Sequence, residues 1–375
     1  MMRKATRMAV TAVLSTLLWN YGGYIDLQLF AVNAEARSAA GLGQFEQEVA
    51  AALKARSSTL HIDYAGDGKE LSANIKDIIR EAIGEDEYTA YIVDSYFYSI
   101  RSWQGDSRVK LTVRYRESLQ ETAEVDRQIK EVLSRIITPG MNDHQKVKAI
   151  HDWVVLRLAY DSGLERYTAY EALKTGKAVC QGYSLLAYRM LSLAGIPARI
   201  VEGKVESGDH AWNLVQLDGA WYHIDATWND PVPDASGKVR YDYYLLTDDV
   251  MSRDHSWTRA YPAADSSYEA ATAALAETGA MPSAFYAVLE RDLGWIWLKP
   301  EHTAATAAEL GARLASSAAD GESKLTLRYL PGETVKRDLE AALEGRPPGV
   351  RGYKASYVPF GNEGAVLLTV TLTLG

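Results

Sequence analysis

The sequence predicts an α+β protein in which a central block, helical first and then β-rich, is flanked by two small α/β modules. A chain of 375 residues is longer than one hydrophobic core usually supports, so several domains are expected. Helical apolar spacing over residues 143–158 and 184–194 precedes two strand-like runs that are joined by Asp218-Gly219. A composition of 47% hydrophobic and 24% charged residues is typical of a globular protein.

The first 36 residues have the pattern of a secretory signal peptide. Arg3, Lys4 and Arg7 precede the apolar run Met8–Trp19, and small residues follow at 34–36. We expect cleavage after residue 34 or 36 and a secreted location, either extracellular or in the cell envelope. An uncleaved anchor is the alternative, although the apolar run is shorter than the about 20 residues that span a bilayer. We expect no stable membrane span after cleavage.

The two flanking modules are predicted from a repeated order of elements. Residues 44–58 have helical spacing, residues 59–64 alternate as a strand, and a helix and two further strands follow up to residue 115. The same order returns near the C-terminus, where Leu325, Leu327 and Tyr329 match Leu60, Ile62 and Tyr64 in pattern. The expected domains are an N-terminal module at 44–118, a core at 119–260, a linker at 261–302 and a C-terminal module at 303–375.

Cys180 is the only cysteine, so the chain cannot form an intramolecular disulfide. An isolated cysteine is often a small buried apolar residue. Here, however, the segment from Lys177 to Tyr183 leads into the predicted helix 184–194, so Cys180 lies at a helix start. The free N–H groups and the dipole at a helix start stabilise negative charge, which favours a thiolate nucleophile.

The predicted hairpin brings a histidine and an aspartate together. If Leu217 faces Ala220 across the turn, paired residue numbers sum to 437, and Asp225 lies opposite Trp212. His210 is then the diagonal neighbour of Asp225 on the same face, where side chains can reach each other. His223 shares this face by strand alternation, so parity alone leaves it open as the base. We prefer His210, which lies at the open end of its strand.

These residues also carry a family resemblance. The segments AVCQGY at 178–183, AGIPAR at 194–199, HAWNLV at 210–215 and DATW at 225–228 resemble the transglutaminase-like superfamily in order and spacing. The resemblance covers about residues 125–260. It implies a papain-like core in which Cys180, His210 and Asp225 form a catalytic triad. Members of the family include protein crosslinkers, peptidases and deglycosylating amidases, and some members have lost the triad and serve as scaffolds.

The expected function is acyl transfer from a protein or peptide amide through a thioester on Cys180, as a peptidase, an amidase or a protein-glutamine transamidase. We favour hydrolysis, because no acidic pocket for a lysine ammonium is recognisable. The alternative is a non-catalytic surface or scaffold protein with a vestigial triad. Tyr160 is either a donor to the oxyanion or a core residue.

We expect no metal, no cofactor and no nucleic-acid partner. The net charge is −9, and His144, His151, His255 and His302 form no zinc-binding motif. These four histidines are expected to face solvent or to bond locally. The expected partner is a protein or peptide substrate, including a cell-wall-associated one. Packing is the expected role of Trp212, Trp221 and Trp228, although Tyr183, Trp212 and Trp228 could also form aromatic walls for a substrate.

Overall fold

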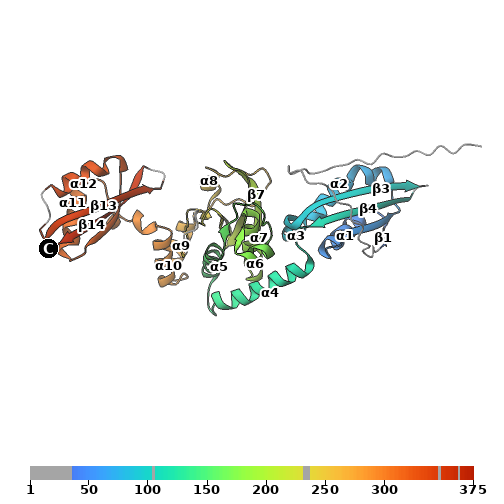
Figure 1. Cartoon of the computed structure of the whole chain (residues 1–375), viewed down its shortest axis with the longest axis horizontal. Coiled ribbons are helices and arrows are strands. Elements are labelled where there is room, and N and C mark those ends of the chain that lie inside the picture. The colour runs from blue at the N-terminus through green and yellow to red at the C-terminus, as the bar shows by residue number, and fades with distance from the viewer. Residues whose placement is uncertain (1–35, 104–105, 231–236, 345–347, 362–363) are drawn as a thin grey trace, which may run out of the picture. The chain divides into compact units, whose positions relative to one another are not determined.

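The computed structural model describes residues 36–103, 106–230, 237–344, 348–361 and 364–375 (Figure 1). The predicted signal peptide lies outside these residues, apart from Ala36. The chain divides into two compact units, at residues 1–268 and 269–375. Across the described residues, we find no helix that combines the length and the apolar character needed to cross a bilayer.

The N-terminal module is a four-stranded sheet covered by helices. Its elements are β1 (Ala36–Ala39), α1 (Leu42–Lys54), β2 (Thr59–Tyr64), α2 (Gly68–Gly84), α3 (Glu87–Ile92), β3 (Val93–Trp103) and β4 (Asp106–Tyr115). The strand order is β1-β2-β4-β3, with β1 parallel to β2 and the other pairs antiparallel. Apolar residues from α1 and α2, such as Phe45 and Ile75, pack in one core with Leu60, Ile62 and Tyr64 of β2.

The C-terminal module has the same connectivity. Its elements are β11 (Thr303–Ala304), α11 (Ala307–Ala319), β12 (Lys324–Tyr329), α12 (Val335–Leu343), β13 (Val350–Phe360) and β14 (Ala365–Leu374). The order β11-β12-β14-β13, with β11 parallel to β12, repeats the topology of the first sheet. The predicted repeat is therefore confirmed. Two helices, α9 (Tyr268–Glu277) and α10 (Ser283–Asp292), precede this module in the chain.

The central block packs helices against an antiparallel sheet. Its helices are α4 (Leu119–Ile136), α5 (Asp143–Arg157), α6 (Ala169–Thr175), α7 (Cys180–Leu193) and α8 (Asp248–Met251). Its main sheet has the order β10-β9-β8-β7, from β7 (Ala198–Val205), β8 (Gly208–Leu217), β9 (Ala220–Ile224) and β10 (Tyr244–Leu246). Two short strands, β5 (Ala159–Tyr160) and β6 (Lys177–Ala178), pair with each other before α7. The mixed α/β character agrees with the predicted fold class.

The hairpin β8–β9 has the predicted register. Leu217 pairs with Ala220, and the pairing continues to Asn213 and Ile224, so each pair of residue numbers sums to 437. Asp218 and Gly219 both have positive φ, at 49° and 85°, as a two-residue turn of type I′ requires. This register fixes which side chains of the two strands share a face.

Helix α3 is bonded to the central block. The Glu87 carboxylate accepts from the N–H of Ile200 at 2.8 Å and pairs with Arg199. The carbonyl of Tyr91 accepts from the Gln181 side chain at 2.6 Å. Gln181 directly follows Cys180, so α3 lies beside the start of α7.

A second connection is made by the buried Glu117 carboxylate. It accepts from the hydroxyls of Tyr88 and Thr122, at 2.8 and 2.7 Å, and from the N–H of Tyr170 at 3.3 Å. Burial raises the pKa of Glu117, against the opposing effect of these hydrogen bonds. The carboxylate thereby ties α3, α4 and α6 together.

Candidate active site

Cys180 is the first residue of α7 and is partly exposed. Two hydrogen bonds hold the first turn of α7, which carries Cys180. The Ser184 hydroxyl donates to the Cys180 carbonyl at 2.9 Å, and the buried Asn213 amide of β8 donates to the Ser184 carbonyl at 3.1 Å. At the start of α7 the N–H of Gly182 donates to the Val179 carbonyl at 2.9 Å, which leaves the N–H groups of Cys180 and Gln181 for an oxygen near the thiol.

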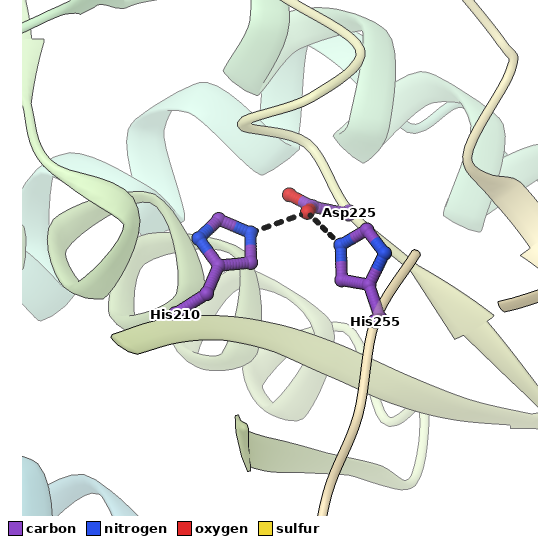
Figure 2. A group of neighbouring side chains, drawn as sticks. All are labelled: His210, Asp225 and His255. Carbon is purple, nitrogen blue, oxygen red and sulfur yellow. Dashed lines mark hydrogen bonds and ion pairs between the residues drawn. The ribbon is translucent and has the colours of Figure 1, made fainter. Parts of the chain in front are cut away.

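His210 lies between Cys180 and Asp225. Its Nε2 is 2.6 Å from Oδ2 of Asp225 (Figure 2). Cys180 lies close enough to act on the same imidazole. Because Asp225 occupies Nε2, Nδ1 is the nitrogen left for the thiol. The structure therefore brings together the three residues that the sequence singled out.

The Asp225 carboxylate is almost fully buried, and both of its oxygens accept hydrogen bonds. Oδ1 accepts from the N–H groups of Thr227 and Trp228, at 2.8 and 3.2 Å. Oδ2 faces His210 and also Nε2 of His255, at 3.3 Å. Burial on its own raises the pKa of Asp225, but the charge and hydrogen bond of His210, followed by those of His255, hold it well below its usual range. Asp225 therefore stays ionised.

The interaction between His210 and Asp225 has the opposite effect on the pKa of His210, which it raises. Burial on its own lowers the pKa of His210, but the charge and hydrogen bond of Asp225, with a smaller contribution from Cys180, raise it to about 10. An imidazole in this position readily takes and keeps a proton at neutral pH.

His255 was not expected at the site. It follows α8, is 1% exposed, and packs its ring 5.5 Å from that of His210 (Figure 2). Its position depends on a close approach between chain segments: Ser256 pairs with Lys204, and a Cβ at Gly203 would lie 2.2 Å from the Ser256 carbonyl oxygen. Only glycine at 203 leaves room for the segment that carries His255.

The expected local bonding is confirmed for His151 and His255, which bond the neighbouring Asp152 and Asp254 at 3.0 and 2.6 Å. The expectation is wrong for His144, whose partners lie far along the chain. His144 and His151 are buried, at 5% and 2% exposure, because each has polar partners inside the protein. His144 contacts Asp218 at 2.9 Å, and His151 contacts Asn229 at 3.0 Å. His302 is half-buried in the second unit. Periodicity alone did not distinguish these buried histidines from surface ones.

His223, the alternative base, is engaged elsewhere. Its Nδ1 accepts from the Trp212 indole at 2.8 Å, and its Nε2 lies 2.8 Å from Asp248. Both ring nitrogens are thus occupied by residues other than Asp225. This geometry favours His210 as the imidazole that serves Cys180.

Three aromatic side chains could have formed walls for a substrate, and the structure excludes this role for Tyr183 and Trp212. Tyr183 and Trp212 are 0% and 1% exposed, because both side chains point into the core, so neither can contact a substrate. Tyr183 donates to the buried Asp230. Trp228 is partly exposed and packs 5.9 Å from the His210 ring, so it can border the site. Trp221 is also partly exposed.

Tyr160 lies close to the cysteine. It pairs with Ala178, two residues before Cys180, and it is 36% exposed. Burial and then the nearby Cys180 raise the pKa of the Tyr160 hydroxyl. The phenol therefore stays protonated and can donate a hydrogen bond near the thiol.

Within the described residues, one group of three side chains could hold a metal ion. The ligand atoms of His210, Asp225 and His255 lie within 4.8 Å of one another (Figure 2). The 2.6 Å separation of His210 and Asp225 is shorter than the about 3.3 Å between ligands of a tetrahedral zinc ion. The group fits a chain of hydrogen bonds better than a metal site.

A cysteine at a helix start, facing a histidine and an aspartate from neighbouring strands, is the arrangement of thiol-dependent enzymes with a papain-like core. Residues 130–226 match the model of the transglutaminase-like superfamily, so the chain contains a transglutaminase-like domain. This finding confirms the resemblance recognised in the sequence.

Individual relatives match part of the chain. The chain is 30% identical to the kyphoscoliosis peptidase of Homo sapiens over 139 residues, which are 31% of this chain and 21% of that protein. It is 29% identical to the Mus musculus protein over 141 residues, which are 32% of this chain and 21% of that protein. It thus spans about a fifth of the length of these curated relatives. A solved structure of a TGase aligns with 45% of this chain and 51% of its own, at 18% identity and a TM-score of 0.27.

Proposed function

We propose that the protein is a thiol-dependent acyl-transfer enzyme that acts on protein or peptide amides, with Cys180 as nucleophile, His210 as base and Asp225 as the residue that orients the base. The observation that carries this proposal is the position of His210, which lies beside Cys180 and 2.6 Å from the buried Asp225 carboxylate. A nucleophile, a base and a group that orients the base are the parts that covalent acyl transfer requires.

The proposed reaction begins when His210 takes the thiol proton at Nδ1. The sulfur then attacks the amide carbonyl, a C–S bond forms, and the carbonyl electron pair moves to oxygen. When the C–N bond breaks, the leaving amine takes the proton from His210, and a thioester remains on Cys180. Water or a second amine attacks the thioester and gives its proton to His210, and Cys180 is regenerated when the C–S bond breaks.

We assign the oxyanion to two donors. One is the N–H of Cys180 at the start of α7, and the other is the Tyr160 hydroxyl, which lies near the thiol. The Gln181 side chain is held by another partner, because its amide donates to the carbonyl of Tyr91 at 2.6 Å.

Hydrolysis is the favoured outcome. A transamidase must keep water, at about 55 M, away from the thioester while it holds an amine. With Tyr183 and Trp212 buried in the core, Trp228 and Tyr160 remain as aromatic groups at the site. This border offers little exclusion of water. The name of the human relative, a peptidase, agrees with the choice.

We also retain the proposal that the protein is exported. It rests on the signal pattern in residues 1–36.

Alkylation of Cys180 tests whether His210 activates it. We expect iodoacetamide to modify Cys180 at pH 6 at least 10-fold faster than a free model thiol, of which only about 0.3% is thiolate at that pH. The anionic reagent iodoacetate should also require the His210 imidazolium. Because the raised pKa of His210 keeps its proton in place up to about pH 10, the iodoacetate rate should fall only as the pH rises through that value.

A Cys180 that reacts no faster than the model thiol would contradict the proposal and favour the scaffold alternative. Replacing His223 by glutamine is the matched control, since that imidazole is bonded to Trp212 and Asp248. We expect this variant to keep the rate within about twofold, because Cys180 and His210 remain paired.

The choice between water and an amine is tested with a glutamine-containing peptide, with and without a dansylated primary amine. We expect release of acid or cleaved peptide to outpace amine incorporation, because the site has few walls against water. Products are followed by mass spectrometry, and Cys180→Ala supplies the background. Amine incorporation that exceeds hydrolysis and disappears in Cys180→Ala would establish a transamidase instead.

A further inference from the structure

Two imidazoles share one oxygen of Asp225. Oδ2 lies 2.6 Å from Nε2 of His210 and 3.3 Å from Nε2 of His255 (Figure 2). Both histidines are buried, at 9% and 1% exposure, so water cannot take the place of either bond. The Asp225 charge is therefore divided between two imidazoles, and His210 is the one on which Cys180 also acts.

The aim of the Asp225 carboxylate does not depend on His255. Oδ1 is fixed by the backbone N–H groups of Thr227 and Trp228, which directs Oδ2 toward His210. Removing His255 would leave these bonds in place. What His255 changes is the strength with which Oδ2 binds the proton on His210.

The orientation of the His255 ring is itself fixed. Its Nδ1 lies 2.6 Å from Oδ1 of Asp254, and the Tyr243 hydroxyl donates to the other Asp254 oxygen at 2.5 Å. The ring also packs against Trp228, with centroids 4.5 Å apart. This support directs Nε2 at Asp225. Both ring nitrogens face carboxylate oxygens, so His255 donates to both when each nitrogen carries a proton.

We propose that His255 is a positioning residue that shares the Asp225 carboxylate with His210 and so weakens the hold of Asp225 on the His210 proton. The inference rests on the proposed acyl-transfer function. In that reaction His210 must give its proton to the leaving amine. A proton held too tightly is a poor general acid, so a second donor on Oδ2 makes proton transfer easier.

Other ionisable groups surround this pair and have to be kept constant in a test. They are Cys180, His151, His223, Tyr243 and Asp254. Replacing Cys180 by alanine in the full chain removes the thiol, whose own ionisation would otherwise affect the titration of His210. The titration of His210 then reports on Asp225 and His255.

The experiment follows the ¹⁵N signals of the histidine rings through a pH titration of the Cys180→Ala chain. The chain has seven histidines, and the His210 signal is assigned by its loss in His210→Gln. Two variants form the matched pair: His255→Gln places its amide N–H near the position of Nε2 and reaches Asp225, whereas His255→Asn reaches only the side of Asp254. His255→Met gives a second variant without a donor, should the asparagine variant fail to fold.

We expect the His210 midpoint to rise by about one pH unit in His255→Asn and His255→Met, because Oδ2 then binds His210 alone. In His255→Gln the His210 midpoint should stay within about 0.3 pH unit of its value in the Cys180→Ala chain that keeps His255. A folded donor-free variant with no rise, or an equal rise in His255→Gln, would overturn the proposal.

Failure of the proposed function has a different signature. If Cys180 in the otherwise unchanged chain alkylates no faster than a model thiol while the His210 midpoints move as expected, the acyl-transfer proposal fails, but His255 and His210 still share Asp225. Rapid alkylation with unmoved midpoints contradicts only the role given to His255.

Discussion

Replacing Cys180 by alanine is expected to reduce acyl-transfer turnover to background, and replacing His210 by alanine to lower it by about 1,000-fold or more. The first change removes the sulfur that forms the thioester. The second removes the imidazole that lies beside the thiol and 2.6 Å from the Asp225 carboxylate. Turnover is measured as acid release from the glutamine peptide, and circular dichroism checks that each variant is folded.

Two further variants sharpen this prediction. Asp225→Asn should cost less than His210→Ala, because the imidazole remains and its orientation is partly kept. His223→Gln should retain turnover within about twofold, since His223 bonds Trp212 and Asp248. Loss of turnover in His223→Gln together with full turnover in His210→Ala would reverse the assignment of the base.

Replacing Trp212 by alanine is expected to lower the free energy of unfolding by about 3–5 kcal/mol. Trp212 is 1% exposed, and its indole donates to His223 at 2.8 Å. Its ring also contacts the rings of His210, His255 and Trp257, with centroids 5.0–5.9 Å apart. The alanine variant leaves a cavity in this cluster and an unpaired nitrogen on His223. Urea denaturation measures the change.

Trp221→Ala is the matched control on the same hairpin. Trp221 is partly exposed, so part of its surface stays in water in the folded state, and we expect a loss of about 1–2 kcal/mol. Equal losses in the two variants would show that the buried cluster around Trp212 contributes no more than an ordinary surface contact.

Much of the candidate site could be predicted because local rules determined it. The two-residue turn at Asp218-Gly219 sets the register of the hairpin. That register makes His210 the diagonal neighbour of Asp225 on the same face. Cys180 could be placed at a helix start, because the apolar spacing of the helix begins directly after it.

The remainder could not be predicted because it depends on contacts between distant segments. His255 reaches Asp225 through the pairing of Ser256 with Lys204, which in turn needs a glycine at 203. No periodicity in the chain around His255 signals this pairing. Strand alternation likewise gave the face on which Trp212 lies, but not that Trp257 and the two histidines cover it.

The hydrogen bonds between α3 and the central block limit where a shortened fragment that contains the site can begin. A fragment that begins at residue 119 would lack the Glu87 carboxylate that accepts from Ile200 and the Tyr91 carbonyl that accepts from Gln181, the residue after the nucleophile. Donors left without acceptors in a protein interior destabilise it by about 1–3 kcal/mol each. The smallest fragment that keeps the site intact therefore begins no later than Asp86, the N-cap of α3. It includes part of the N-terminal module, which supplies none of the reacting groups.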